Sequence, residues 1–137
     1  MSQENVELTR QVFEIFTRQG WEPLMGTYLD PEIVWDMTPT GIPGLGTYRG
    51  FDELRSFFED WFGAFPFEDW EQQLDEVIDC GEQIVVALTR QRAPGSTSGA
   101  VTELEYAQVV KFRRGKAVEV AIYLDRAEAL EAAGLWE

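Results

Sequence analysis

A stripe of large apolar side chains between residues 51 and 65 constrains the fold of this chain more than any other feature. The stripe recurs at steps of three and four residues, which is the spacing of one face of an α-helix. Its members are Leu54, Phe57, Phe58, Trp61, Phe62 and Phe65. Pro66 follows at once and ends the predicted helix. A face this wide and aromatic must be buried, so the rest of the chain has to provide a large apolar surface for it.

That surface is predicted to be a β-sheet. The pattern after residue 66 favours four strands, over about 67–79, 83–92, 101–113 and 116–124. Residues 79–82 and 113–116 are predicted to form tight turns, and the Gly- and Ser-rich segment 94–99 a longer, mobile connection. Helices followed by antiparallel strands are typical of an α+β fold. We therefore expect the 51–65 helix to lie against the concave face of the sheet.

The N-terminal part of the chain is predicted to hold two helices and a strand. Apolar residues at helical spacing indicate a helix over 3–19, with Ser2 as its N-cap and Gly20 as its stop. A short second helix is expected over about 21–29, and a short strand over 32–37.

The C-terminal residues predict one more helix. Asp125 is expected to be its N-cap, because Glu128, three residues on, completes a capping box. The pattern shows no internal repeat and no linker, so residues 1–137 are expected to form a single domain.

Composition argues against several classes of function. The formal net charge is −14, which disfavours nucleic acid and anionic membrane partners, since those surfaces attract clustered Lys and Arg. The sequence has no His, which removes the usual zinc ligand and the usual base for a Ser or Cys nucleophile. It also has no phosphate-binding loop or metal-ligand motif, so we expect no cofactor and no metal.

Cys80 is the only cysteine, so no disulfide can form within the chain and a reducing compartment is expected. No apolar run approaches the roughly 20 residues of a membrane span. The first five residues are polar, unlike a signal peptide. We therefore expect a soluble, cytoplasmic protein. Asp79 and Glu82 should raise the pKa of the Cys80 thiol, which predicts an unreactive cysteine.

Five short strings, taken together and in order, resemble the SnoaL-like branch of the nuclear transport factor 2-like family. They are Val34-Trp-Asp36, Tyr48-Arg-Gly50, Phe57-Phe58, Arg113-x-Gly-Lys116 and Tyr123-Leu-Asp-Arg126. The resemblance covers essentially the whole chain. It implies a cone in which a curved, mixed sheet wraps around helices, with an apolar pocket at the open end, and it implies a dimer. The fold hosts isomerases, cyclases, dehydratases, epoxide hydrolases and proteins that only bind, so it does not by itself give the activity.

Asp36 is the residue that the resemblance singles out for chemistry. It follows Trp35 at the end of the first predicted strand, where the ketosteroid isomerase branch keeps its general base. Among aromatic side chains the charged carboxylate is disfavoured, so the pKa of Asp36 should rise into a useful range. The alternative is an aspartate that caps the Gly- and Pro-rich loop 38–50. Pairing with Arg49 would then hold it ionised as a structural anchor.

Gln108 is the second candidate catalytic residue. It lies between Ala107 and Val109 and shares a strand face with Tyr106 and Val110. The resemblance places it where the isomerase branch has an oxyanion-stabilising acid, and an amide N–H can also donate to a developing oxyanion. The alternative is a glutamine on the outer face of the sheet or in a dimer contact.

The remaining candidate site residues are aromatic and are expected to bind substrate. They are Phe13, Tyr28, Trp35, Tyr48, Trp61 and Tyr106. Their hydroxyl and indole groups could donate hydrogen bonds at the pocket mouth. Trp61 also belongs to the helical stripe, so ordinary core packing is the alternative for that residue.

Departures from the family's enzymes limit the analogy. Phe13 stands where the isomerases carry a donor Tyr. In the cyclase branch the acid/base Asp and its partner His align with Ile122 and Gln108, so a polyketide cyclase of that design is not expected. The epoxide hydrolases use an Asp-Arg-Asp set, of which only the Arg has a counterpart, Arg90 or Arg92, without an acidic pair predicted to face it.

Two functions remain open. One is a cofactor-independent enzyme of the isomerase, cyclase or hydrolase type, in which Asp36 moves a proton on a small apolar substrate while Gln108 or a Tyr holds the enolate oxygen. The alternative is a protein that binds a lipophilic metabolite without catalysis, or a dimeric interaction module. The enzyme and the binding protein would each have a small apolar molecule as partner, and the interaction module would not.

A homodimer is expected to form through the outer face of the sheet. Helices are predicted to cover only the concave face, and the outer face carries Ala107, Val109, Ala121 and Tyr123. An exposed apolar patch of this kind tends to mark an interface.

Overall fold

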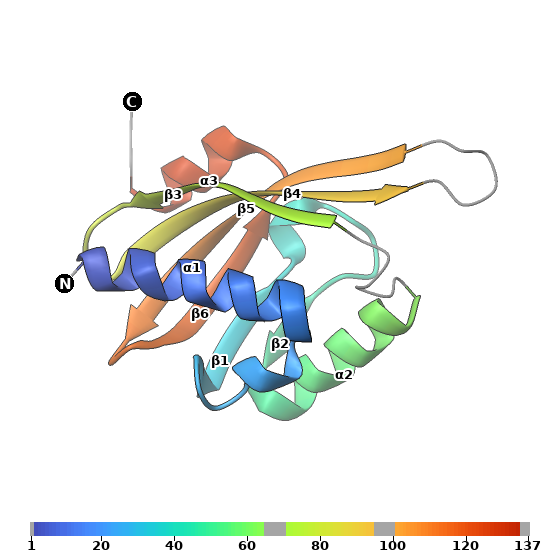
Figure 1. Cartoon of the computed structure of the whole chain (residues 1–137), viewed down its shortest axis with the longest axis horizontal. Helices are drawn as coiled ribbons and strands as arrows, with labels where there is room; N and C mark the ends of the chain where they lie inside the picture. The colour runs from blue at the N-terminus through green and yellow to red at the C-terminus, as the bar shows by residue number, and fades with distance from the viewer. Residues whose placement is uncertain (1, 65–70, 95–100, 135–137) are drawn as a thin grey trace.

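The computed structural model describes residues 2–64, 71–94 and 101–134, which form one curved sheet with helices on both of its faces (Figure 1). The helices and helical turns are α1 (Ser2–Gln19), η1 (Glu22–Leu24), η2 (Thr38–Thr40), α2 (Gly50–Ala64) and α3 (Arg126–Ala132). The strands are β1 (Leu29–Asp36), β2 (Thr47–Arg49), β3 (Glu71–Asp79), β4 (Ile84–Pro94), β5 (Val101–Arg113) and β6 (Lys116–Tyr123).

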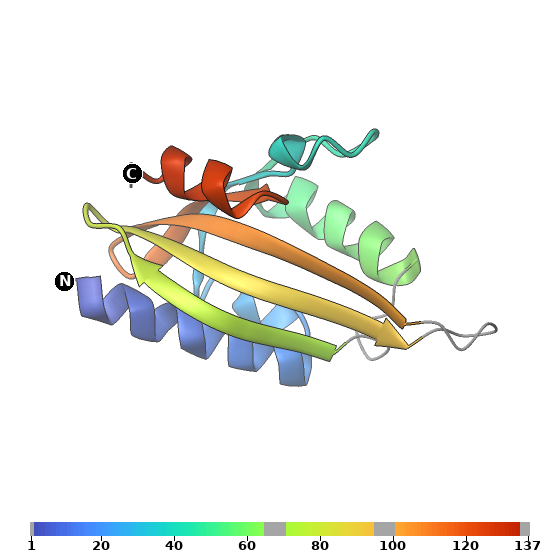
Figure 2. The same ribbon diagram turned by 90° about the horizontal axis from the view of Figure 1, so that it is seen from above.

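The strands form a single sheet in the order β2-β1-β6-β5-β4-β3. Neighbouring strands are antiparallel except β1 and β6, which run parallel. The sheet is therefore mixed, as predicted. Register shifts interrupt the pairing between Leu74 and Glu76 and between Lys111 and Phe112, and such bulges increase local twist. They contribute to the curl of the long strands that is visible in Figure 2.

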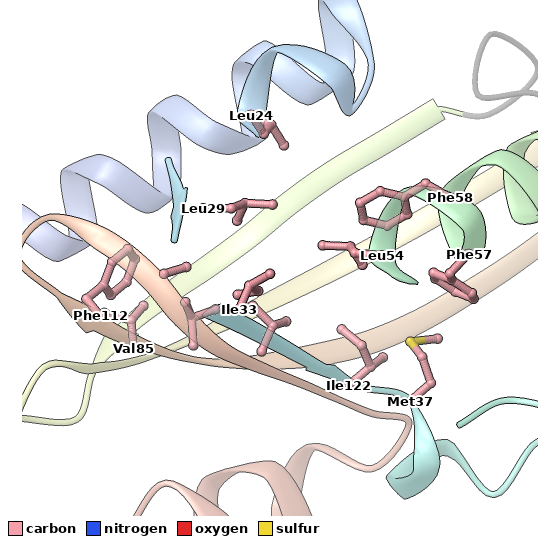
Figure 3. Packing of buried hydrophobic residues seen from close by; sticks show 13 residues of the cluster. Leu24, Leu29, Ile33, Met37, Leu54, Phe57, Phe58, Val85, Phe112 and Ile122 are labelled. Atoms are coloured by element: carbon pink, nitrogen blue, oxygen red, sulfur yellow. The ribbon is translucent and has the colours of Figure 1, made fainter. Parts of the chain in front are cut away.

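Helices α1 and α2 pack on the concave face, as predicted for α2. From α2, Leu54, Phe57 and Phe58 are buried in one apolar cluster with residues of β1, β4, β5 and β6. Figure 3 shows Leu54, Phe57 and Phe58 pointing from α2 towards Ile122 and Ile33 of the sheet. The stripe that dominates the sequence is thus the side of α2 that closes the core.

The end of the first helix and the start of the last follow the predictions. Gly20, with a φ of 85°, ends α1 and donates its N–H to the Phe16 carbonyl oxygen at 2.9 Å. Asp125 is the N-cap of α3, and its side chain accepts the Glu128 N–H at 3.0 Å. Helix α1 begins one residue earlier than predicted, at Ser2, so the prediction that Ser2 is its N-cap is wrong.

The segment from 21 to 50 differs most from the prediction. The helix expected over 21–29 is only the short turn η1, because Met25 directly after it is extended, with a φ of −65° and a ψ of 126°, and β1 already begins at Leu29. The segment 38–50, expected to be a loop, contains η2 and strand β2. A strand of three residues is too short to show alternation, so only its pairing with β1 identifies it.

The outer face of the sheet is more covered than the sequence indicates. Helix α3 packs there, on the side of β3–β5 opposite α1 (Figure 2), and Ala129 and Ala133 form a second apolar cluster with Val86, Leu88 and Ala107. The expectation that helices cover only one face is therefore wrong. The cause is that a short helix with alanines on its inner side gives a weak apolar signal.

Three expectations fall outside the described residues: the end of α2 at Phe65 and Pro66, the strand residues 67–70, and the connection 95–99. Across the residues that the structure describes, no helix has the length and apolar character needed to cross a membrane.

Candidate functional site

A pocket of about 160 Å³ lies between the concave face of the sheet and helices α1 and α2. Most of its lining is aromatic or aliphatic. Phe57, Phe58 and Trp61 of α2 form one wall, and Trp35 of β1 lies edge-on against Phe58, with ring centroids 5.2 Å apart. None of the described residues that line the pocket is an Asp, Glu, Lys or Arg.

Three polar residues of the lining lie on the two longest strands, β4 and β5. Gln91 of β4, with Tyr106 and Gln108 of β5, face the pocket from the concave side. Residues of a strand alternate between faces, so Tyr106 and Gln108 project together while Ala107 points to α3. These three side chains are neutral hydrogen-bonding groups, and Thr9, Tyr28 and Thr40 add further hydroxyls elsewhere in the mostly apolar lining.

Tyr106 is the centre of the three polar residues on β4 and β5. Its hydroxyl donates to Oε1 of Gln72 on β3, at 3.4 Å. Burial raises the pKa of Tyr106, and hydrogen bonding to the side chains of Thr89, Gln108 and Gln91 opposes that rise without cancelling it. Tyr106 is therefore a neutral hydrogen-bond donor or acceptor, and not a base.

Asp36 does not line the pocket. Trp35 faces the concave side, so Asp36, the next residue of β1, projects to the outer side. It accepts hydrogen bonds from the N–H of Thr38 at 2.9 Å, the hydroxyl of Thr38 at 2.7 Å and the hydroxyl of Thr47 at 3.0 Å. Partial burial raises the pKa of Asp36, but these bonds and the charge of Arg49 outweigh it, so the pKa lies below its ordinary value.

The expectation that Asp36 points into the cavity with a raised pKa is therefore wrong, and the loop-capping alternative describes its position. Tyr123 of β6 also indicates that Asp36 projects to the outer face of the sheet. Its pKa is raised first by burial and then by the charge of Asp36, which places the two side chains near each other. Ala121, which pairs with Asp36 across β1 and β6, lies on the same face as Tyr123.

The family model of the SnoaL-like domain matches residues 9–120, which is most of the chain. The chain belongs to the SnoaL-like family. None of the curated proteins matches it.

Solved structures with the fold of this SnoaL-like protein have diverse descriptions. A nuclear transport factor 2-like protein of unknown function from Burkholderia pseudomallei K96243 is 26% identical, with a TM-score of 0.67 over 96% of this chain and 98% of that one. A candidate SnoaL-like polyketide cyclase from Jannaschia sp. CCS1 is 17% identical, with a TM-score of 0.70 over 98% and 94%. TerC, co-crystallised with polyporic acid, is 19% identical, with a TM-score of 0.70 over 95% and 98%. These likenesses establish the nuclear transport factor 2-like cone.

Most of the predicted site residues lie around the pocket of this SnoaL-like protein. Those that line it are Phe13, Tyr28, Trp35, Trp61, Tyr106 and Gln108. Tyr48 does not line it, because its ring stacks on Phe57 at 4.5 Å and its hydroxyl oxygen accepts the Gly46 N–H at 3.2 Å. The Trp35 indole N–H, expected as a donor to ligand, donates instead to the sulfur of Met37 at 3.2 Å.

This SnoaL-like chain departs from the family's enzymes at two residues that line the pocket. Phe13 and Ile122 both line it, so an apolar side chain stands at each place where the resemblance implies a polar one in the isomerase or cyclase branch. These substitutions make the pocket more apolar than the resemblance by itself implies.

Arg90 has the acidic neighbours that the sequence did not predict. Its guanidinium binds the Asp75 carboxylate at 2.8 and 3.0 Å and lies 3.7 Å from Glu103. This cluster does not line the pocket, and Arg90 is about one-third exposed. Ion pairs this exposed contribute little to stability, and the cluster offers nothing to a ligand in the pocket.

Sequence reasoning missed Gln91, which lines the pocket, and Thr89 and Gln72, which contact Tyr106 behind it. Each is a polar residue within a predicted strand, and the sequence gives no signal that sets it apart from the other polar residues of the same strands. Only the register shows their proximity, since Gln72 pairs with Gln91 and Thr89 pairs with Tyr106.

Proposed function

We propose that this SnoaL-like protein binds one small, uncharged and mostly apolar molecule in its pocket without moving a proton on it. The observation that carries the proposal is the absence of any carboxylate, Lys or Arg among the described lining residues, together with the outward orientation of Asp36. Acid/base catalysis on a carbon acid needs a base within hydrogen-bond reach of the substrate. Asp36, the base expected from the sequence, is held by Thr38 and Thr47 instead.

The size of the pocket supports a small ligand. An engineered apolar cavity of about 150 Å³ in another protein binds benzene, and the pocket here measures about 160 Å³. A single ring with short substituents fits such a volume, and a larger molecule would have to extend past the rim. The co-crystallisation of TerC with polyporic acid is consistent with a role of this fold in holding organic molecules.

Toluene titration tests the proposal directly. Trp21, Trp35 and Trp61 line the pocket, so bound toluene should change the tryptophan emission in a saturable way with one site per chain. At a toluene concentration of 100 times Kd, the free energy of unfolding should rise by about 2.7 kcal/mol. An emission change that grows linearly and never saturates would show that no such site exists.

A filled-pocket variant locates the site. Ala87 of β4 is buried and lines the pocket next to Gln108, its partner on β5. Ala87→Leu should therefore place its larger side chain in the ligand volume. We expect it to weaken toluene binding at least tenfold. Ala127→Leu makes the same change at an exposed position of α3 and should leave binding unaltered. Equal affinities of the two variants would place the toluene elsewhere.

Proton exchange separates binding from catalysis. Acetophenone carries acidic methyl hydrogens, and an enzyme of the type expected from the sequence would exchange them with solvent deuterium. We expect the exchange rate in D₂O to be the same with and without the protein. A faster exchange that is lost in Ala87→Leu would show an acid/base enzyme and contradict the non-catalytic proposal.

A further inference from the structure

The pocket is long rather than round. On β5 its lining runs from Leu104 to Phe112. On β6 it runs from Ala117 to Leu124. Successive residues of a strand lie about 3.3 Å apart along its axis, so the β5 wall alone extends over about 26 Å. Figure 3 shows the apolar cluster stretched in the same way, with Phe112 near one end and Met37 near the other. A volume of about 160 Å³ spread over this length makes the pocket a narrow channel.

One end of the channel is open and the other is closed. Ile42 and Leu124 line the pocket and are 39% and 40% exposed, so they stand at the mouth. Phe112 and Ala117 also line it and are only 4% and 5% exposed, which makes them the floor. The register agrees, because Phe112 pairs with Ala117 at the start of β6, whereas Leu124 directly follows the end of that strand.

The polar side chains halfway along the channel are hydrogen-bonded to one another. Tyr106 donates its hydroxyl hydrogen to Oε1 of Gln72 at 3.4 Å. Its hydroxyl is also hydrogen-bonded to the side chains of Thr89, Gln108 and Gln91. Because these groups have partners within the protein, an apolar chain can pass them without leaving them unpaired.

The threonine hydroxyls of the lining are used in the same way. Thr9 donates its hydroxyl hydrogen to the Asn5 carbonyl oxygen at 2.8 Å. Thr40 donates its own to the Met37 carbonyl oxygen at 2.7 Å. Since the described lining also has no charged side chain, the interior of the channel favours hydrocarbon, and a polar group of the ligand is better placed at the mouth.

We propose that the channel binds a neutral, unbranched alkyl chain, which extends from a polar end at Ile42 and Leu124 to the floor at Phe112 and Ala117. This inference rests on the proposed function, since it names the class of molecule that the pocket binds. A single ring such as toluene occupies only part of the length, whereas an extended chain fills it. The floor then sets the longest chain that fits.

A series of 1-alkanols measures the length of the channel. Each additional CH₂ that is buried should strengthen binding about fourfold. We expect this rise to continue from 1-butanol at least to 1-octanol and to stop once the chain reaches the floor. The saturable change in tryptophan emission gives the affinities. A rise that stops before 1-octanol would contradict the inference.

Two isomeric alcohols test the width of the channel. 1-Octanol and 2,4,4-trimethylpentan-1-ol have the same atoms and similar apolar areas, so a pocket without a preference for shape binds them within about threefold of each other. The branched carbons of the second alcohol are too wide for a narrow channel. We therefore expect 1-octanol to bind at least about tenfold more tightly.

Variants at the floor assign the length limit to this end of the channel. Ala117→Leu fills the closed end and should weaken 1-octanol binding at least about tenfold, while 1-butanol, which has room nearer the mouth, stays within about twofold. Phe112→Leu makes the floor smaller and should extend the rise in affinity by at least one carbon. It carries the test if Ala117→Leu fails to fold. Ala127→Leu, at an exposed position of α3, should leave the whole series unaltered.

The outcomes separate this inference from the function on which it rests. If toluene binds but 1-octanol does not, or if the branched isomer binds as tightly as 1-octanol, the pocket is confirmed and the alkyl-chain channel is wrong. A length limit that neither Ala117→Leu nor Phe112→Leu moves also overturns the channel. If toluene and all the alkanols fail to bind, the proposed function fails and the inference fails with it.

Discussion

Asp36 is held by hydrogen bonds from two threonines, and these bonds connect the end of β1 to η2 and to β2. Asp36→Ala removes all three and should lower the free energy of unfolding by about 1–2 kcal/mol. Asp36→Asn keeps an acceptor oxygen and should lower the free energy of unfolding by less than Asp36→Ala does. Urea unfolding measures both. Toluene affinity should stay within about twofold of the intact chain, and a large loss would instead place Asp36 at the ligand.

The pH dependence of stability gives a second test of Asp36. Its folded-state pKa lies below the ordinary value, so its contribution is present above the unfolded pKa of about 3.9 and is lost as pH falls through the folded value. The stability difference between the intact chain and Asp36→Asn should therefore shrink below about pH 4. A difference that grows on acidification would mean that the folded-state pKa is raised.

Cys80 is expected to react slowly with thiol reagents. Burial and then the charge of Asp79 raise the pKa of its thiol, and the thiolate is the reactive form. Iodoacetamide should alkylate the folded protein more slowly at pH 8 than it alkylates a peptide of residues 78–82, which has the same neighbouring charges without the burial. Equal rates would show that the fold does not protect the thiol.

At the scale of the element, α2 carries the heaviest apolar load, and Leu54 is its most deeply buried residue, with no exposed surface. Leu54→Ala should lower the free energy of unfolding by about 2–5 kcal/mol, because it removes buried methyl groups and leaves a cavity. Glu59→Ala, on the exposed side of the same helix, should stay within about 0.5 kcal/mol of the intact chain. Urea unfolding of both variants tests whether the sequence stripe marks the side of α2 that holds the fold together.

At the scale of the whole molecule, the homodimer stays a prediction with a smaller expected interface. Helix α3 covers Ala107, so the remaining patch on the outer face consists of Val109, Ala121 and Tyr123, all half-buried. Light scattering at micromolar concentration should give about twice 15.7 kDa, and Tyr123→Lys should shift the mass to the monomer value. A monomer mass for the unaltered chain would contradict the prediction.

The sequence by itself determined the type and order of most elements. Steps of three and four residues in α2, the capping box at Asp125 and the tight turns at Gly81 and Gly115 are local signals, because each depends on backbone geometry within a few residues. Alternation along β5 likewise predicted that Tyr106 and Gln108 share a face, and both line the pocket.

Only the tertiary structure decided which face each polar residue occupies. A shift of one residue moves a strand side chain from the concave to the outer face, and the pairing of β1 with β6 places Trp35 inside and Asp36 outside. The cluster of Gln72, Gln91 and Tyr106 likewise exists only because β3, β4 and β5 pair in one register. These contacts join residues far apart in the chain, and the free energy that selects the register comes from burying the whole core.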